Sequence, residues 1–211
     1  MTRGTWVAAL VVVGAAWVGS AVVIGRLPER VPIHWNFQGV ADGFGLRTTA
    51  FVLPTVLCGL LALFAALPRL SPGSFQMNEF RPTYGIIVVL TLAILATVHA
   101  LALAAALGQR VDMTRFITAA VLLGLGVMGN FLGRVRRNFF VGVRVPWTLA
   151  SERVWNETHR MAAWVTCGGG LLGSAVALAG YPLIALGLLV PIIAVPIAFS
   201  FVRSRQLEAR G

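Results

Sequence analysis

Apolar residues fill six long intervals of the chain, and shorter polar intervals separate them. An α-helix rises about 1.5 Å per residue, so about 20 apolar residues cross the hydrocarbon core of a bilayer. We therefore predict six membrane-spanning helices, at residues 5–24, 48–67, 83–107, 116–132, 161–179 and 182–202.

A cleaved signal peptide is the alternative for the first interval, because Arg3 gives the chain a basic start. The apolar core of this interval is longer than that of a signal peptide, however, and no clear Ala-x-Ala cleavage site follows it. We therefore expect residues 5–24 to remain as a span.

The composition excludes a soluble globule. Apolar residues make up 58% of the 211 residues and charged residues 11%, with a mean hydropathy of +0.85, which leaves too little polar surface. The predicted fold class is all-α, a polytopic membrane protein with about six transmembrane helices. Cys58 and Cys167 lie inside apolar intervals, so we expect neither a disulfide framework nor a metal motif.

The basic residues orient the predicted spans. All of them are arginine, and together with seven acidic residues they give a formal net charge of +10. Arginine between apolar spans is the usual retention signal at a cytoplasmic face, so direct nucleic-acid binding is not expected. With the amino terminus inside, the cytoplasmic set is Arg3, Arg69, Arg81, Arg134, Arg136, Arg137, Arg144, Arg153, Arg160, Arg203, Arg205 and Arg210, and the outer set is Arg26, Arg30, Arg47, Arg110 and Arg115. The larger cytoplasmic set predicts that both termini are cytoplasmic.

The polar interval of residues 25–47 is then expected outside the membrane. Two prolines prevent a helix there, and glycines mark turns, most plainly at Asp42-Gly43. In the extended stretch, His34 and Asn36 share one face.

Few side chains suit metal or proton chemistry. His34, Asp42 and His99 could meet a metal or a proton, but their spacing matches no zinc motif. Hydrogen bonds from His34 and Asn36 that tie the loop are the preferred interpretation. His99 and Asn130 lie in apolar intervals, where we expect hydrogen bonds between helices. No cofactor is expected, and the near absence of ionisable groups from the spans argues against an enzyme.

The longest polar interval, residues 138–160, is here called the platform, and the arginine count places it on the cytoplasmic side. Residues 138–146 lack helical periodicity and contain Gly142 and Pro146, which predicts an extended or looped course along the membrane surface. Aromatic residues such as Trp147 are expected to anchor it there.

The second half of the platform is predicted to be helical. Thr148 or Ser151 can cap this helix, and Glu152 then lies in its first turn, at the positive end of the helix dipole. Trp155 and His159 lie one turn apart on one face, which predicts a stacked or hydrogen-bonded patch.

Protein docking is the functional hypothesis for exposed Arg144, Arg153, Trp155 and His159, since Trp and Arg dominate binding hot spots. The alternative is a purely structural lock onto neighbouring spans. The full set of platform candidates is Asn138, Gly142, Arg144, Pro146, Trp147, Thr148, Arg153, Trp155, His159 and Arg160, and the outer-loop candidates are Pro32, His34, Asn36, Gly39 and Asp42.

Two motifs carry a family resemblance. The first is Leu27-Pro-x-x-Val-Pro-Ile-His-Trp-Asn36, followed by Gly39 and Asp42. The second is Gly129-Asn130, then Asn138-x-x-Val-Gly-Val-Arg-Val-Pro-Trp-Thr-Leu149 and Val154-Trp-x-x-Thr-His-Arg160. The pair resembles the SdpI family of bacterial multi-span membrane proteins: the first motif is similar to an amino-terminal domain of unknown function common in that family, and the second to its carboxy-terminal signature. The arginine-rich lead-in at residues 134–137 departs from the lysine and proline expected there, but it keeps the charge.

The resemblance implies a two-span unit at residues 1–82, with the outer loop at 25–47, and an SdpI-like four-span unit at 83–211, with a cytoplasmic loop at 133–160. It also implies a location in the bacterial cytoplasmic membrane. The implied role is immunity to a secreted antimicrobial peptide on the outer face and, in some members, signalling through membrane sequestration of a small winged-helix repressor on the inner face. A transporter or efflux component for a small or lipidic solute is the alternative.

Overall fold

A computed structural model describes residues 1–70 and 77–209 of the chain. In this part, six helical segments are long and apolar enough to cross a membrane, which confirms the predicted all-α class. Residues 71–76 of the second interhelical loop lie outside the described residues, as does Arg210 of the predicted cytoplasmic set. The helices of the six spans are α1 (Arg3–Val23), α2 (Val52–Ala66), α3 (Arg81–Ala106), α4 (Met113–Leu132), α6 (Glu152–Leu178) and the pair α7 (Pro182–Gly187) and α8 (Leu189–Glu208).

Shorter elements connect these helices. A two-stranded antiparallel hairpin, β1 (Arg30–Trp35) and β2 (Ala41–Leu46), follows α1, and the short helix α5 (Pro146–Ala150) precedes α6. Single turns of 3₁₀-helix occur at η1 (Ile24–Arg26), η2 (Arg47–Phe51), η3 (Leu67–Arg69) and η4 (Met77–Phe80).

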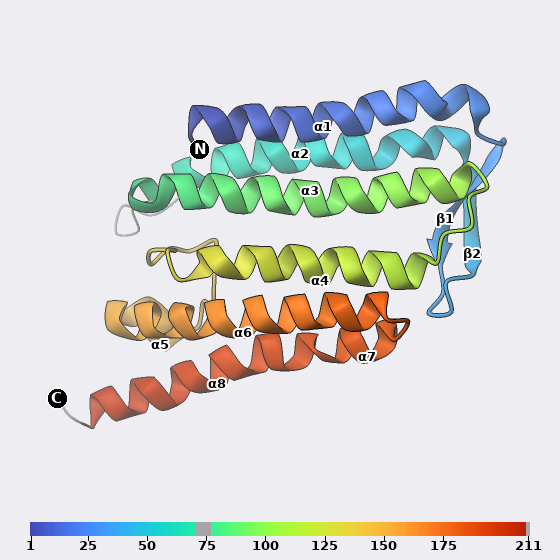
Figure 1. Ribbon diagram of the computed structural model, residues 1–211. Coiled ribbons are helices and arrows are strands. Elements are labelled where there is room, and N and C mark those ends of the chain that lie inside the picture. Colours follow the sequence, from blue (N-terminus) through green and yellow to red (C-terminus); the bar gives the residue numbers. More distant parts are fainter. Residues whose placement is uncertain (71–76, 210–211) are drawn as a thin grey trace.

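The helices form an elongated bundle in which α3 and α4 lie side by side (Figure 1). On one side of this pair α1 and α2 pack with α3, and on the other side α6 packs with α4 and α8 packs with α6. The hairpin lies at one end of the bundle, while α5 and both chain ends lie at the opposite end (Figure 1). The two polar segments with family motifs are therefore separated by the length of the spans.

Glycines bring α4 and α6 into direct backbone contact. A Cβ on Gly129 would lie 2.5 Å from the backbone nitrogen of Cys167, and one on Gly170 would lie 2.4 Å from that of Gly126. Side chains larger than hydrogen would force the two helices apart, as in other small-residue helix pairs in membranes. The start of α6, which belongs to the platform, is thereby held close to the end of α4.

The hairpin corrects the predicted turn. Asp42 and Gly43 do not form a turn, because both lie in β2 and a Cβ on Gly43 would approach the Cβ of His34 on β1 to 2.9 Å. The chain reverses earlier, where Asn36 Oδ1 accepts two backbone N–H groups and Gly39 takes a φ of 76°. Glycine is thus needed at residue 43 because the opposite strand leaves no room for a side chain, and at residue 39 because the backbone takes a positive φ.

The last predicted span is interrupted once. Leu188 separates α7 from α8, so residues 182–202 are not one continuous helix. Pro191 lacks a backbone N–H and cannot bond to the carbonyl of Gly187, which is the physical reason for a break at this point.

Candidate functional site

The loop between α4 and α5, residues 133–145, is organised around one buried side chain. Asn138 is 0% exposed. Its Oδ1 accepts the backbone N–H groups of Phe140 and Val141, both at 2.7 Å. Its Nδ2 donates to the carbonyl oxygens of Arg136 at 2.8 Å and Val141 at 3.1 Å. The amide makes all the hydrogen bonds it can within the loop, so its role there is to fix the backbone course.

Trp155 of α6 attaches the beginning of this loop. Its indole Nε1 donates to the carbonyl oxygen of Val135 at 2.7 Å, and the side chain is fully buried. The ring of His159 lies over it, with centroids 4.0 Å apart and 21° between the planes. The stacked pair predicted from helical spacing is present, in the protein interior.

His159 attaches the end of the same loop. Its Nδ1–H donates to the carbonyl oxygen of Trp155 at 2.8 Å, which leaves Nε2 to accept the backbone N–H of Val143 at 3.0 Å. Gly142 precedes this contact with a φ of 110°, and a Cβ there would lie 2.0 Å from His159 Nε2. Any side chain at residue 142 would therefore displace the imidazole or the loop.

The short helix α5 is held on both sides. Thr148 Oγ1 accepts the backbone N–H of Val145 at 3.0 Å and donates to the carbonyl oxygen of Val143 at 2.8 Å. Trp147 Nε1 donates to Ser200 Oγ of α8 at 2.8 Å. The platform therefore contacts the last span as well as the first turns of α6.

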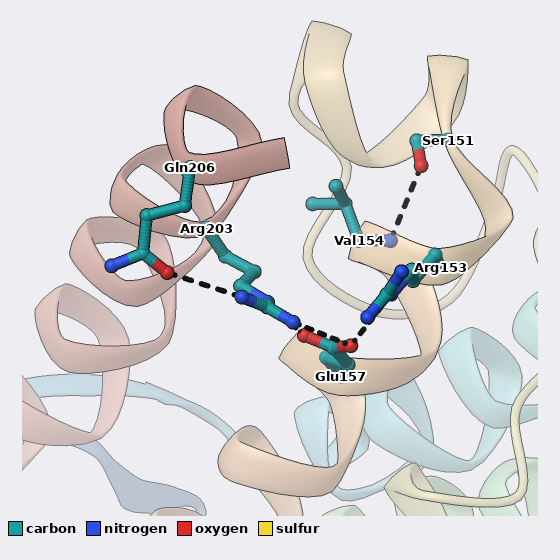
Figure 2. A network of polar contacts seen from close by, with 6 residues as sticks. All are labelled: Ser151, Arg153, Val154, Glu157, Arg203 and Gln206. Atoms are coloured by element: carbon teal, nitrogen blue, oxygen red, sulfur yellow. Dashed lines mark hydrogen bonds and ion pairs between the residues drawn. The ribbon is translucent and has the colours of Figure 1, made fainter. Parts of the chain in front are cut away.

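A carboxylate between two guanidinium groups joins α6 to α8 (Figure 2). Arg203 of α8 donates from Nε and Nη2 to the two carboxylate oxygens of Glu157, and Arg153 Nε donates to Glu157 Oε1 at 3.2 Å. The side chains of Glu157 and Arg203 are each 19% exposed, whereas that of Arg153 is 65% exposed. The two-point contact with Arg203 is thus the shielded and stronger one.

Four platform candidates are inaccessible, so the expectation of exposed Trp155 and His159 is wrong. Their side chains are 0% and 1% exposed, and Asn138 and Thr148 are 0% exposed. The physical reason is that the loop folds over α6 and presents its backbone groups to these side chains. Such burial favours the structural lock as the role of all four residues.

The accessible candidates are mainly basic. Arg144, Arg153 and Arg160 are exposed, as is Pro146 at the start of α5. Arg144 Nη1 also donates to the carbonyl oxygen of Phe139 at 2.6 Å, which holds its side chain along the loop. A partner that docks on the platform would meet these arginines and no buried aromatic ring.

At the other end of the molecule, hydrogen bonds tie the hairpin together. His34 Nδ1 lies 2.5 Å from Asp42 Oδ1 across the two strands, and both residues are exposed. Pro32 stands opposite Phe44 in the strand register. The predicted loop-tying role of His34 is supported by this pair.

The two polar candidates within the spans differ. His99 of α3 is 5% exposed, and its Nε2 lies 2.9 Å from Ser20 Oγ of α1, so the predicted contact between helices is present. Asn130 contradicts its prediction: it is exposed on α4, and within the described chain its side chain makes no hydrogen bond. The neighbouring Gly129 faces α6, and a one-residue step of 100° turns Asn130 away from that helix.

Comparison with known proteins identifies both motif-bearing regions. Residues 134–202 match the SdpI/YfhL protein family, and residues 11–58 match a domain of unknown function, DUF1648. Immunity protein SdpI of Bacillus subtilis (strain 168) is 28% identical over 164 residues, which cover 75% of each chain. These matches support the resemblance to the SdpI family that the two sequence motifs indicate. No solved structure matches it.

Each matched region includes one of the two polar segments at opposite ends of the bundle. The SdpI/YfhL match includes the platform and the spans packed on it, while the DUF1648 match includes the hairpin between α1 and α2. The predicted resemblance to the SdpI family and the location in the cell membrane as a multi-pass protein are thereby confirmed.

Glu157 and Arg203 were not among the candidate site residues predicted from the sequence. The spacing of Arg153 and Glu157, four residues apart on a predicted helix, indicates a local pair. Nothing local indicates Arg203, because it lies 46 residues further along the chain and reaches Glu157 only through the packing of α8 on α6.

Separate replacement of Arg203 and Arg153 compares how much the shielded and the exposed contact with Glu157 contribute to stability. We expect Arg203→Gln to lower the unfolding midpoint of the detergent-solubilised protein by about 4 °C, because it leaves a shielded carboxylate with one weak partner. Arg153→Gln, which removes the same charge from an exposed position, should lower it by about 1 °C or less. Equal shifts in the two variants would show that the contact between α6 and α8 has no special weight.

Proposed function

We propose that this protein protects the bacterial cytoplasmic membrane against a secreted antimicrobial peptide, and that its platform also holds a small winged-helix repressor at the inner membrane surface. The observation that carries the proposal is the similarity to Immunity protein SdpI over three quarters of both chains. Neither binding event requires bond chemistry, which suits spans whose polar side chains serve mainly to join helices.

The proposed orientation places the platform and both termini in the cytoplasm and the hairpin outside. The platform and both termini lie at the same end of the bundle (Figure 1). This end carries most of the arginines. An excess of arginine favours the cytoplasmic side. The proposed division into a unit of residues 1–82 and an SdpI-like unit of residues 83–211 follows the same two family motifs.

The hairpin is the proposed site of contact with the peptide. It exposes apolar side chains at the outer end of the molecule: Ile33 is 52% exposed, Phe37 74% and Phe44 51%. Exposed apolar groups gathered on a polar segment are typical of a surface that binds a partner. A membrane-active peptide is amphipathic and can cover such groups with its own apolar face.

The platform is the proposed site of contact with the repressor. Because Trp155 and His159 are buried, contact is assigned to the exposed basic side chains of Arg144 and Arg153. Their backbone support is rigid, since Asn138 makes all its hydrogen bonds within the loop. A rigid basic surface suits an acidic patch on a cytosolic partner.

A transporter or efflux component remains the second candidate, favoured by one observation. An apolar cavity of about 320 Å³ lies between the hairpin and α3, and His99 forms part of its wall. Under this candidate, proteoliposomes would show flux of a small or lipidic solute that His99→Ala abolishes.

Survival measurements test immunity. We expect deletion of the gene to sensitise the native cells to culture supernatant of the parental strain, and expression in a sensitive host to protect that host. The hairpin variant Phe37→Ser/Phe44→Ser should lose most of this protection while its unfolding midpoint stays near that of the unaltered protein, since both side chains are exposed. Unchanged killing curves after deletion and after expression would remove immunity from the account.

Localisation of a regulator tests the signalling role. A fluorescent fusion of a co-expressed small winged-helix regulator is expected at the membrane when the protein is present and peptide is added. Arg144→Ala should release most of it into the cytoplasm, because that guanidinium is exposed on the platform. Arg205→Ala, which removes an exposed arginine near the carboxy terminus, serves as the matched control. Retention of the regulator by the Arg144 variant would contradict docking on the platform.

A further inference from the structure

A basic groove lies at the platform end of the bundle, where α3, α4 and α6 meet. It has a volume of about 620 Å³. One wall comes from the start of α3 and the residues before it, and the other from the loop that follows α4 and the first turns of α6. The groove therefore spans the junction between the two sides of the bundle that α3 and α4 connect.

Three arginines determine the charge of this groove. Arg134 and Arg136 reach it from the loop after α4, and Arg160 reaches it from α6; all three are exposed. The ion pairs found in the described part of the chain join other residues, so no carboxylate neutralises these three guanidinium groups. Glu79 is the one acidic residue in the lining, and Asn156 adds a neutral amide. The groove thus keeps an excess of positive charge.

The groove lies at the boundary between apolar and charged sequence in three spans. Arg160 is the last charged residue before the apolar part of α6, residues 161–178, and Arg134 follows directly after the apolar end of α4. Arg81 occupies the corresponding position at the start of α3. In a bilayer this boundary coincides with the headgroup layer, where phosphate groups lie.

The local environment of Arg134 fits this level. Its guanidinium carbon lies 5.7 Å from the ring centroid of Phe131, the residue one turn earlier on α4. An arginine that rests on an aromatic ring keeps its N–H groups free to form two-point hydrogen bonds with a phosphate.

We propose that the groove lined by Arg134, Arg136 and Arg160 binds the phosphate-bearing headgroup of an anionic phospholipid. Charge complementarity and the position of the groove at headgroup depth favour a lipid over an acidic segment of a soluble protein, because such a segment would have to enter the headgroup layer. Basic pockets between transmembrane helices are suited to such headgroups. A bound headgroup would contact α3 and α6 together and so join the two sides of the bundle. The proposal stands independently of immunity and of repressor docking.

Lipid retention by the purified full-length protein tests this site. Native mass spectrometry would count phosphatidylglycerol and phosphatidylcholine molecules that remain bound after release from detergent. We expect the unaltered protein to prefer phosphatidylglycerol, and Arg134→Gln/Arg136→Gln/Arg160→Gln to bind it at least tenfold more weakly, since each arginine near an anionic lipid contributes roughly fivefold. The charge-matched control is Arg26→Gln/Arg30→Gln/Arg47→Gln, at the hairpin end, whose affinity should stay within about twofold.

Four results would overturn the proposal. One is equal loss in the two triple variants, which would indicate a general charge effect, and another is no preference for phosphatidylglycerol. Competition by millimolar inorganic phosphate would indicate a free-anion site, and displacement of the lipid by a polyglutamate peptide would indicate an acidic protein segment as the occupant. If the triple variant of the groove does not fold, the single variant Arg136→Gln is measured in its place. Its affinity for phosphatidylglycerol is expected to fall roughly fivefold. An unchanged affinity in that single variant would likewise refute the site.

Discussion

The platform depends on one side chain of α6, the imidazole of His159. A loop at a membrane surface must satisfy its backbone N–H and C=O groups within the protein or with water. His159 meets part of this requirement by accepting the N–H of Val143, while its other nitrogen is committed to the carbonyl of Trp155. This arrangement requires a bare backbone at Gly142, because any Cβ there would meet the ring. The position of the end of the loop, at Val143, thus follows from a tautomer and a glycine.

The helix that carries His159 is also the centre of the second half of the bundle. Its glycines bring it against α4, and the contact between Glu157 and Arg203 holds it to α8. The platform is therefore fixed to three spans at once, and its exposed arginines stand on a rigid base. Rigid presentation is what both a docking surface and a headgroup groove need, because flexible side chains on a mobile loop lose more conformational entropy on binding. The hairpin at the opposite end exposes apolar rings instead.

Much of this organisation can be predicted from the sequence, and the remainder depends on tertiary packing. Long apolar intervals predict the six spans because a bilayer admits few other structures. The Ser151 cap and the stacked pair of Trp155 and His159 follow from spacing along one helix, and both are present. Their burial could not be predicted, since it results from a loop that folds back over them. The contact of Glu157 with Arg203 likewise arises from helix packing across 46 residues.

The most direct test of this account compares two glycines that share a positive φ. Gly142, at 110°, lies against His159, whereas Gly180, at 99°, would place a Cβ in open space. Gly180→Ala should lower the free energy of unfolding by about 1 kcal/mol through backbone strain alone. Gly142→Ala should lower it by about 3 kcal/mol or more, with faster hydrogen exchange at the amide of Val143, because the imidazole must move. Equal losses in the two variants, with unchanged exchange at Val143, would contradict a platform held by His159.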